Sequence, residues 1–159
     1  MRLPMETYWA WTQEKTEIAR KLDAGQCGGS YSEAVIILCA VLSTLATEVW
    51  RGRGIDRVRF VELLISFSPP HLAATRISIP LLVGYLRANR RIDESEAIRG
   101  VFLNYDSSRI LTGDDVDKPE TEILSVCQEL SLKELREHSY ANLLYGKIRS
   151  AYAHTYRPE

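Results

Sequence analysis

The sequence predicts an all-α protein, a single-domain helical bundle over residues 1–159. Apolar residues recur at helical spacing in most segments, and no segment shows the sustained apolar and polar alternation of a β-strand. The chain has 159 residues, of which 45% are hydrophobic, which is enough for one domain with a sizeable core. It contains no internal repeat, no linker and no low-complexity tract.

The first helix is predicted from Met5 to Leu22, because apolar residues recur near the 3.6-residue period there and Gly25 follows. Residues 1–25 are assigned to this N-terminal helix. The pattern from Ser30 to Glu33 is that of a capping box. It predicts the start of a second helix that extends to Trp50.

The second helix is apolar on nearly every face as far as Leu42, which is typical of a helix that is either buried or in a membrane. Its run of about thirteen apolar residues is shorter than a bilayer requires. We therefore expect it to be the central core helix and expect no membrane contact.

Four further helices are predicted from apolar periodicity with a cap or a proline at one end: residues 56–67, 80–88, 93–103 and 119–130. The polar stretch 104–118 is expected to be a loop. The last helix opens at the Ser131–Glu134 capping box and is predicted to run to Tyr152 or beyond.

The composition restricts the partners that the protein can recruit. The net charge is −1, so binding to nucleic acid would need a local basic patch. Fifteen of the twenty basic residues are arginines, a bias that suits phosphate recognition but also follows from high genomic GC content. Four of them surround two glycines, and this cluster is either a phosphate-binding patch or, as we favour, a solvated turn: Arg51, Arg53, Arg57 and Arg59.

The three cysteines are odd in number and lack metal-ligand spacing, which indicates buried thiols in a reducing compartment. The N-terminal segment has no apolar core or cleavage site of a signal peptide. We expect a cytoplasmic location and no cofactor. The acidic run at residues 114–117 is interpreted as a solvated loop and not as a metal site.

The last predicted helix carries Arg149 and His154, five positions apart. An arginine and a histidine can together bind a phosphodiester and transfer a proton near neutral pH, although a surface arginine and a helix-end histidine would give the same pattern. On an α-helix these two positions differ by about 140°, whereas Arg149 aligns with Asn142 and Tyr145. A shared cleft is easier to form between two copies related by a two-fold axis.

The stretch Leu144-Tyr145-Gly146-Lys147-Ile148-Arg149, with His154 after it, resembles the Arg-x(4-6)-His motif of the HEPN superfamily. The buried stretch 33–40 and the segment 54–62 are similar to earlier parts of that family, so residues 30–156 are identified as a HEPN-like core. The resemblance implies a helical bundle with the motif on its last long helix. It also implies a homodimer through that helix and metal-independent cleavage of RNA.

The resemblance implies that Arg149 and His154 are catalytic. Ser150 stands where many active members have Asn, Asp or His, and it is a possible supporting residue together with Asn142 and Glu48. Expected RNA contacts come from three residues: Lys147, Tyr145 and Tyr152. The two tyrosines are, however, more easily explained by packing, and Glu48 by an exposed position near a helix end.

The expected activity is that of a toxin or defence endoribonuclease whose products carry 2′,3′-cyclic phosphate and 5′-hydroxyl ends. An antitoxin or another regulatory protein is a possible partner. Two alternatives stay open. One is a non-catalytic HEPN-like module that binds RNA or a protein through the same surface, and the other is an unrelated helical interaction domain.

Overall fold

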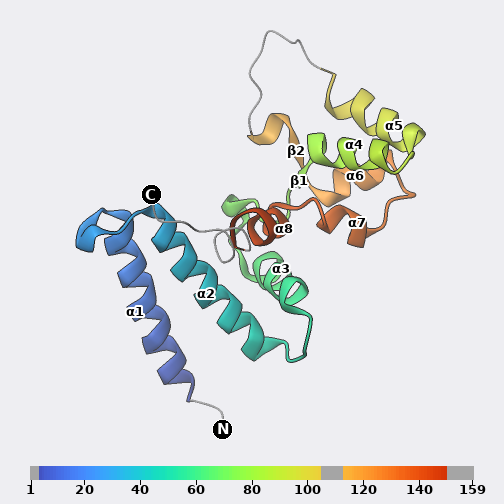
Figure 1. Cartoon of the computed structure of the whole chain (residues 1–159). Coiled ribbons are helices and arrows are strands. Elements are labelled where there is room, and N and C mark those ends of the chain that lie inside the picture. Colours follow the sequence, from blue (N-terminus) through green and yellow to red (C-terminus); the bar gives the residue numbers. More distant parts are fainter. Residues whose placement is uncertain (1–3, 105–112, 150–159) are drawn as a thin grey trace. The chain divides into compact units, whose positions relative to one another are not determined.

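The computed structural model describes residues 4–104 and 113–149 (Figure 1). The chain is mostly helical, at 74%, which confirms the predicted helical class. The described residues form eight α-helices and one two-stranded antiparallel sheet. They divide into two compact units, here called unit 1 (residues up to Leu63, and Leu144–Arg149) and unit 2 (Leu64–Leu143). The expectation of a single domain stays a prediction.

Unit 1 contains two helices that lie side by side, α1 (Met5–Asp23) and α2 (Tyr31–Val49) (Figure 1). Gly25 and Gly28, both at φ 70°, adopt the left-handed conformation that the turn between the helices requires. The predicted capping box starts α2: the Ser30 amide donates to Glu33 Oε2 at 2.9 Å, and the Ser32 amide donates to Ser30 Oγ at 3.3 Å.

Helix α2 is longer and more apolar along its length than the sequence argument assumed. It has 19 residues with a mean hydropathy of 1.7, enough by length and composition to cross a membrane, so the argument from length was wrong. The core helix of a soluble protein meets the same criteria. Four of its positions are buried: Ala34, Cys39, Val41 and Ala46. The absence of membrane contact stays a prediction.

Helix α3 (Asp56–Phe67) begins in unit 1 and continues into unit 2. The segment before it turns at Gly54, whose φ is 72°, and Pro69 follows its end. Phe60 and Leu63 are its buried residues. Its bounds are those that the apolar periodicity predicts.

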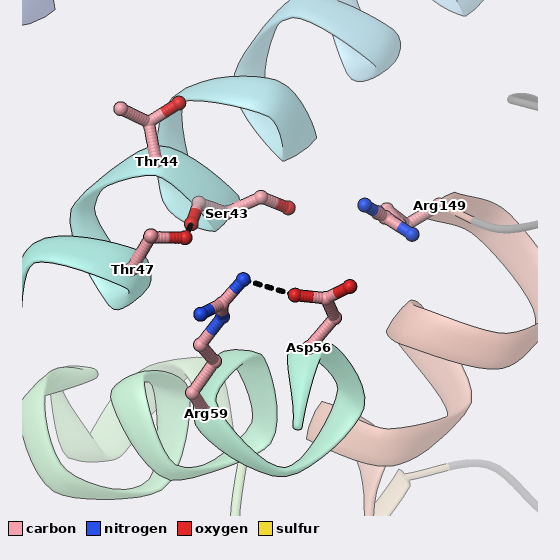
Figure 2. Close-up of a pocket in the computed structure, with 6 residues that line it drawn as sticks. All are labelled: Ser43, Thr44, Thr47, Asp56, Arg59 and Arg149. Atoms are coloured by element: carbon pink, nitrogen blue, oxygen red, sulfur yellow. Dashed lines mark hydrogen bonds and ion pairs between the residues drawn. The ribbon is translucent and has the colours of Figure 1, made fainter. Parts of the chain in front are cut away.

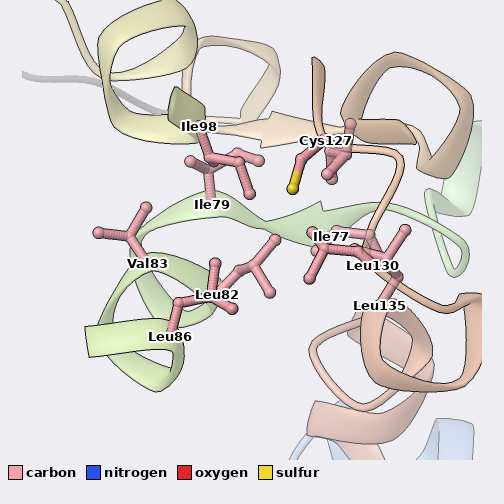
Figure 3. Close-up of a cluster of buried hydrophobic side chains, with 10 residues drawn as sticks. Ile77, Ile79, Leu82, Val83, Leu86, Ile98, Cys127, Leu130 and Leu135 are labelled. Atoms are coloured by element: carbon pink, nitrogen blue, oxygen red, sulfur yellow. The ribbon is translucent and has the colours of Figure 1, made fainter. Parts of the chain in front are cut away.

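Unit 2 is built around a cluster of large buried side chains (Figure 3). They come from α4 (Ile79–Ala88), α5 (Ile92–Phe102), α6 (Glu120–Val126), α7 (Leu132–Arg136) and the segments beside them. The members are Ile77, Ile79, Leu82, Val83, Leu86, Ile98, Ile123, Cys127, Leu130 and Leu135. Burial of such side chains contributes about 1.5–3 kcal/mol each to folding.

The two strands are β1 (Ile77–Ser78) and β2 (Asp117–Lys118), paired antiparallel with Ile77 opposite Lys118. The sequence prediction had no strand, and it placed β2 in a loop. Two-residue strands are too short to produce an alternating pattern.

The last predicted helix is not continuous. Helix α7 ends at Arg136, α8 covers only Tyr140–Leu143, and a π-helix follows at Leu144–Arg149. The break occurs because the backbone there bonds to the β1 region: the Tyr140 amide donates to the Arg76 carbonyl at 3.0 Å, and the Ser78 amide donates to the His138 carbonyl at 3.1 Å. These partners replace bonds that a continuous helix would make within itself.

A buried carboxylate joins β2 to α8. Asp117 is 2% exposed and accepts a hydrogen bond from Tyr140 Oη at 2.5 Å. Arg76 Nη1 also donates to the Asp117 carbonyl oxygen at 3.2 Å. The hydrogen bond to Asp117, together with burial, raises the pKa of Tyr140 to about 12.

Tyr140→Phe should lower the free energy of unfolding by about 1.5 kcal/mol, the lower end for a hydrogen bond to a charged group, because Tyr140 is 40% exposed. The raised pKa means that the stabilisation is present in full below about pH 10 and is lost as the pH rises towards 12. Urea unfolding of both proteins across this range measures the difference. A difference that stays constant up to pH 12 would contradict the assignment.

Candidate functional site

Unit 1 contains a pocket of about 170 Å³ in which every lining residue is polar (Figure 2). The residues come from α2, the start of α3 and the π-helix: Ser43, Thr44, Thr47, Asp56, Arg59 and Arg149. Two guanidinium groups and one carboxylate give the lining a formal charge of +1. Arg149, the arginine of the predicted motif, is therefore in a pocket with a positive lining.

The three hydroxyl residues of α2 differ in what they can offer to a ligand. Thr44 Oγ1 donates to the Ala40 carbonyl at 3.0 Å, and Thr47 Oγ1 donates to the Ser43 carbonyl at 2.8 Å. Each threonine hydroxyl has thus used its proton and can only accept. Ser43 Oγ is buried and has no hydrogen-bond partner among the described residues. It is the hydroxyl whose proton remains for a ligand.

Arg59 is held in place at the beginning of α3. Its Nη2 group pairs with Asp56, one helical turn earlier, and its Nη1 group donates to the Gly52 carbonyl at 3.4 Å. The Arg59 side chain is only 12% exposed, whereas that of Asp56 is 55% exposed. The arginine is therefore fixed before any ligand arrives.

Arg149 is anchored through Tyr145. Its Nη1 group donates to Tyr145 Oη at 3.2 Å, and its guanidinium carbon lies 4.9 Å from the centre of the tyrosine ring. The Tyr145 ring in turn meets buried Phe60 edge to face, with 5.4 Å between ring centres. Figure 2 shows the Arg149 guanidinium facing Ser43 and Asp56 across the pocket.

The charge of Arg149 also affects the pKa of a buried thiol on α2, that of Cys39. Burial raises the pKa of the Cys39 thiol above its usual value, and the positive charge of Arg149 partly offsets this rise. The raised pKa favours the neutral form of the Cys39 thiol at physiological pH.

The other predicted site residues that the structure describes are not part of the pocket lining. Lys147 is exposed on the π-helix, and Tyr145 makes the packing contacts that were the alternative to base stacking. Glu48 is half-buried on α2 and does not line the pocket. Asn142 belongs to unit 2, where it is 7% exposed and its Nδ2 group donates to the Glu137 carbonyl at 2.5 Å. Its amide closes a turn there.

Three predicted site residues lie outside the described residues: Ser150, Tyr152 and His154. Their assigned roles stay predictions. The described part of the motif is therefore its arginine half, with Lys147 and Tyr145.

Most residues of the pocket were not predicted from the sequence. Four of its residues were not singled out: Ser43, Thr44, Thr47 and Asp56. The arginine cluster after α2 contained a signal, because Arg59 lines the pocket while Arg51, Arg53 and Arg57 are exposed. The helical spacing of 43, 44 and 47 was a second signal, since these residues share one face of α2.

Within residues 4–104 and 113–149, no group of three or more His, Cys, Asp or Glu side chains is placed to hold a metal ion. No family model, curated protein or solved structure matches this chain. The class that the structure itself defines is a largely helical protein with a polar pocket lined by two arginines. The chemistry of that pocket is the basis for a functional proposal.

Proposed function

We propose that the protein is a metal-independent endoribonuclease of the HEPN type. The observation that carries the proposal is the position of Arg149. The motif arginine is anchored by Tyr145 and lines a polar pocket together with a second arginine and a free hydroxyl donor. A surface arginine that merely solvates a helix end would need no such surroundings.

Arginine suits this role because its planar group binds two oxygens of a phosphate at once. In the proposed reaction the ribose 2′-hydroxyl attacks the adjacent phosphorus, and a bond from O2′ to phosphorus forms. The bond from phosphorus to O5′ breaks, which gives a 2′,3′-cyclic phosphate and a 5′-hydroxyl. Arg149 would bind the non-bridging oxygens as negative charge accumulates on them.

The proton moves through His154 in this proposal. A histidine, with an ordinary pKa near 6.5, can accept the proton of the 2′-hydroxyl and can return one to the leaving O5′. Both steps are available near neutral pH without a metal ion. Lys147, exposed beside Arg149, is suited to a neighbouring phosphate.

We also propose the location, oligomeric state and regulation that the family resemblance implies. The protein acts in the cytoplasm as a homodimer paired through its last helical segment, as a toxin or defence component. Its activity is held in check by an antitoxin or another regulatory protein.

The second candidate is a non-catalytic module that binds RNA or a protein through the same pocket. Ser150 favours it, because a hydroxyl group is a weaker match than the Asn, Asp or His that follows the arginine in many active members of the HEPN superfamily. Binding through Arg149 needs no general base, so the pocket would serve this function equally well.

The deciding experiment is incubation of the purified protein with single-stranded RNA of mixed sequence in EDTA, followed by analysis of product ends by mass spectrometry. We expect cyclic-phosphate and 5′-hydroxyl ends. DNA of the same sequence should stay intact, because it lacks the attacking 2′-hydroxyl. If the folded protein binds the RNA without cutting it, the binding module is the correct function.

A further inference from the structure

We propose that Arg59 is a second phosphate-binding residue, and that the pocket holds one phosphodiester group of single-stranded RNA between the guanidinium groups of Arg59 and Arg149. The identity of the ligand as RNA rests on the proposed function. The role of Arg59 rests on the geometry of the pocket, to which the family motif contributes only Arg149.

Both arginines keep hydrogen-bond donors for a ligand. A guanidinium group has five N–H donors. Arg59 engages Asp56 and the Gly52 carbonyl, and Arg149 engages Tyr145. Each therefore retains more than one N–H, and Ser43 adds a hydroxyl donor from α2. These donors come from three separate elements and line the same pocket, as a phosphate with several oxygens requires.

The charge of the pocket selects the kind of phosphate. Two arginines and Asp56 give +1, which matches the single negative charge of a phosphodiester. A terminal phosphate monoester carries about 1.5 to 2 negative charges at neutral pH. Such a ligand would leave one charge unbalanced beside the Asp56 carboxylate. The pocket is thus suited to a phosphate within a chain.

Asp56 acts as a positioning residue for Arg59. Its ion pair and the Gly52 carbonyl hold a side chain that is only 12% exposed, so little rotamer entropy remains to be lost on binding. The volume of about 170 Å³ is that of several water molecules, enough for one phosphate group. The hydrogen-bond donors, the formal charge and the volume of the pocket all match one phosphodiester group.

The test is the salt dependence of RNA binding. A fluorescein-labelled single-stranded RNA is titrated in EDTA with the His154→Ala protein, used so that no cleavage occurs, and the Kd is measured by anisotropy at several KCl concentrations. Each phosphate contact on a single strand contributes about −0.7 to the slope of the logarithm of the association constant against the logarithm of the salt concentration. Adding Arg59→Ala should make that slope less steep by about 0.7 and weaken binding about tenfold.

Two further variants separate binding from folding. Arg59→Lys keeps the charge and should keep the slope, and circular dichroism monitors the helix content of each protein. Arg20→Ala is the matched control, because Arg20 is an exposed residue of α1 that pairs with Glu17 and does not line the pocket. It should leave both slope and affinity unchanged.

An unchanged slope in folded Arg59→Ala protein would overturn the proposal and would assign Arg59 to the α2–α3 turn alone. Absence of RNA binding would overturn it as well. If sodium phosphate at matched ionic strength displaces the RNA, the pocket binds the phosphate ion and the diester assignment is wrong. Failure of the proposed function is distinct: the wild-type protein would not cut RNA, while the Arg59-dependent slope would persist.

Discussion

Replacement of His154 by alanine should lower the rate of RNA cleavage by a factor of about 10² to 10⁴, the usual contribution of a general acid or base. Alanine cannot accept the 2′-hydroxyl proton or protonate the leaving O5′. Binding of RNA should change much less, because the phosphate contacts of Arg149 and Arg59 remain. Single-turnover cleavage rates in EDTA measure the first effect, and anisotropy measures the second.

His71→Ala is the matched control for this substitution. His71 is exposed in the turn after α3, in unit 2. The His71→Ala protein should cleave RNA at the wild-type rate. If His154→Ala retains full activity and correct product ends, His154 is not the proton carrier. If it loses RNA binding in parallel with cleavage, its role is in contact with the RNA and not in proton transfer.

Phe60→Ala should lower the free energy of unfolding of unit 1 by about 3–5 kcal/mol. Phe60 is 0% exposed, and it supports the Tyr145 ring that anchors Arg149. Removing the ring leaves a cavity and frees Tyr145, so RNA binding should weaken at temperatures where the variant is still folded. All three tryptophans lie in residues 1–63, so their fluorescence during urea unfolding reports on unit 1.

Val58→Ala on the same helix provides the comparison. Val58 is 67% exposed, and its truncation should change the free energy of unfolding by less than about 0.5 kcal/mol. Phe60→Leu, which keeps most of the apolar contact, should lie between the two. Equal loss in Phe60→Ala and Val58→Ala would show that the Phe60–Tyr145 contact does not support unit 1.

The features that the sequence predicted well are local ones. Both capping boxes, at Ser30 and at Ser131, are present with their reciprocal hydrogen bonds, because the residues that make them are three positions apart. The contact between Tyr145 and Arg149 was visible in their spacing of four. Such interactions depend on neighbours in the chain and so leave a pattern in it.

The features that were missed depend on distant partners. The break after Arg136 follows from backbone bonds to Arg76 and Ser78, about sixty residues earlier, and no periodicity near the break records them. In the sequence, nothing distinguishes Arg59 from the three exposed arginines beside it. Its pairing with Asp56 and the Gly52 carbonyl and its place in the pocket lining distinguish it from them.

Unit 2 lies in the sequence between the two parts of unit 1, and this has a consequence for synthesis. A ribosome makes α2, α3 and all of unit 2 before it reaches the segment that carries Arg149. The α2 and α3 sides of the pocket are therefore present in the growing chain while the pocket still lacks one of its two arginines. For a protein proposed to cut RNA, the growing chain therefore lacks a proposed phosphate-binding residue until the π-helix is made.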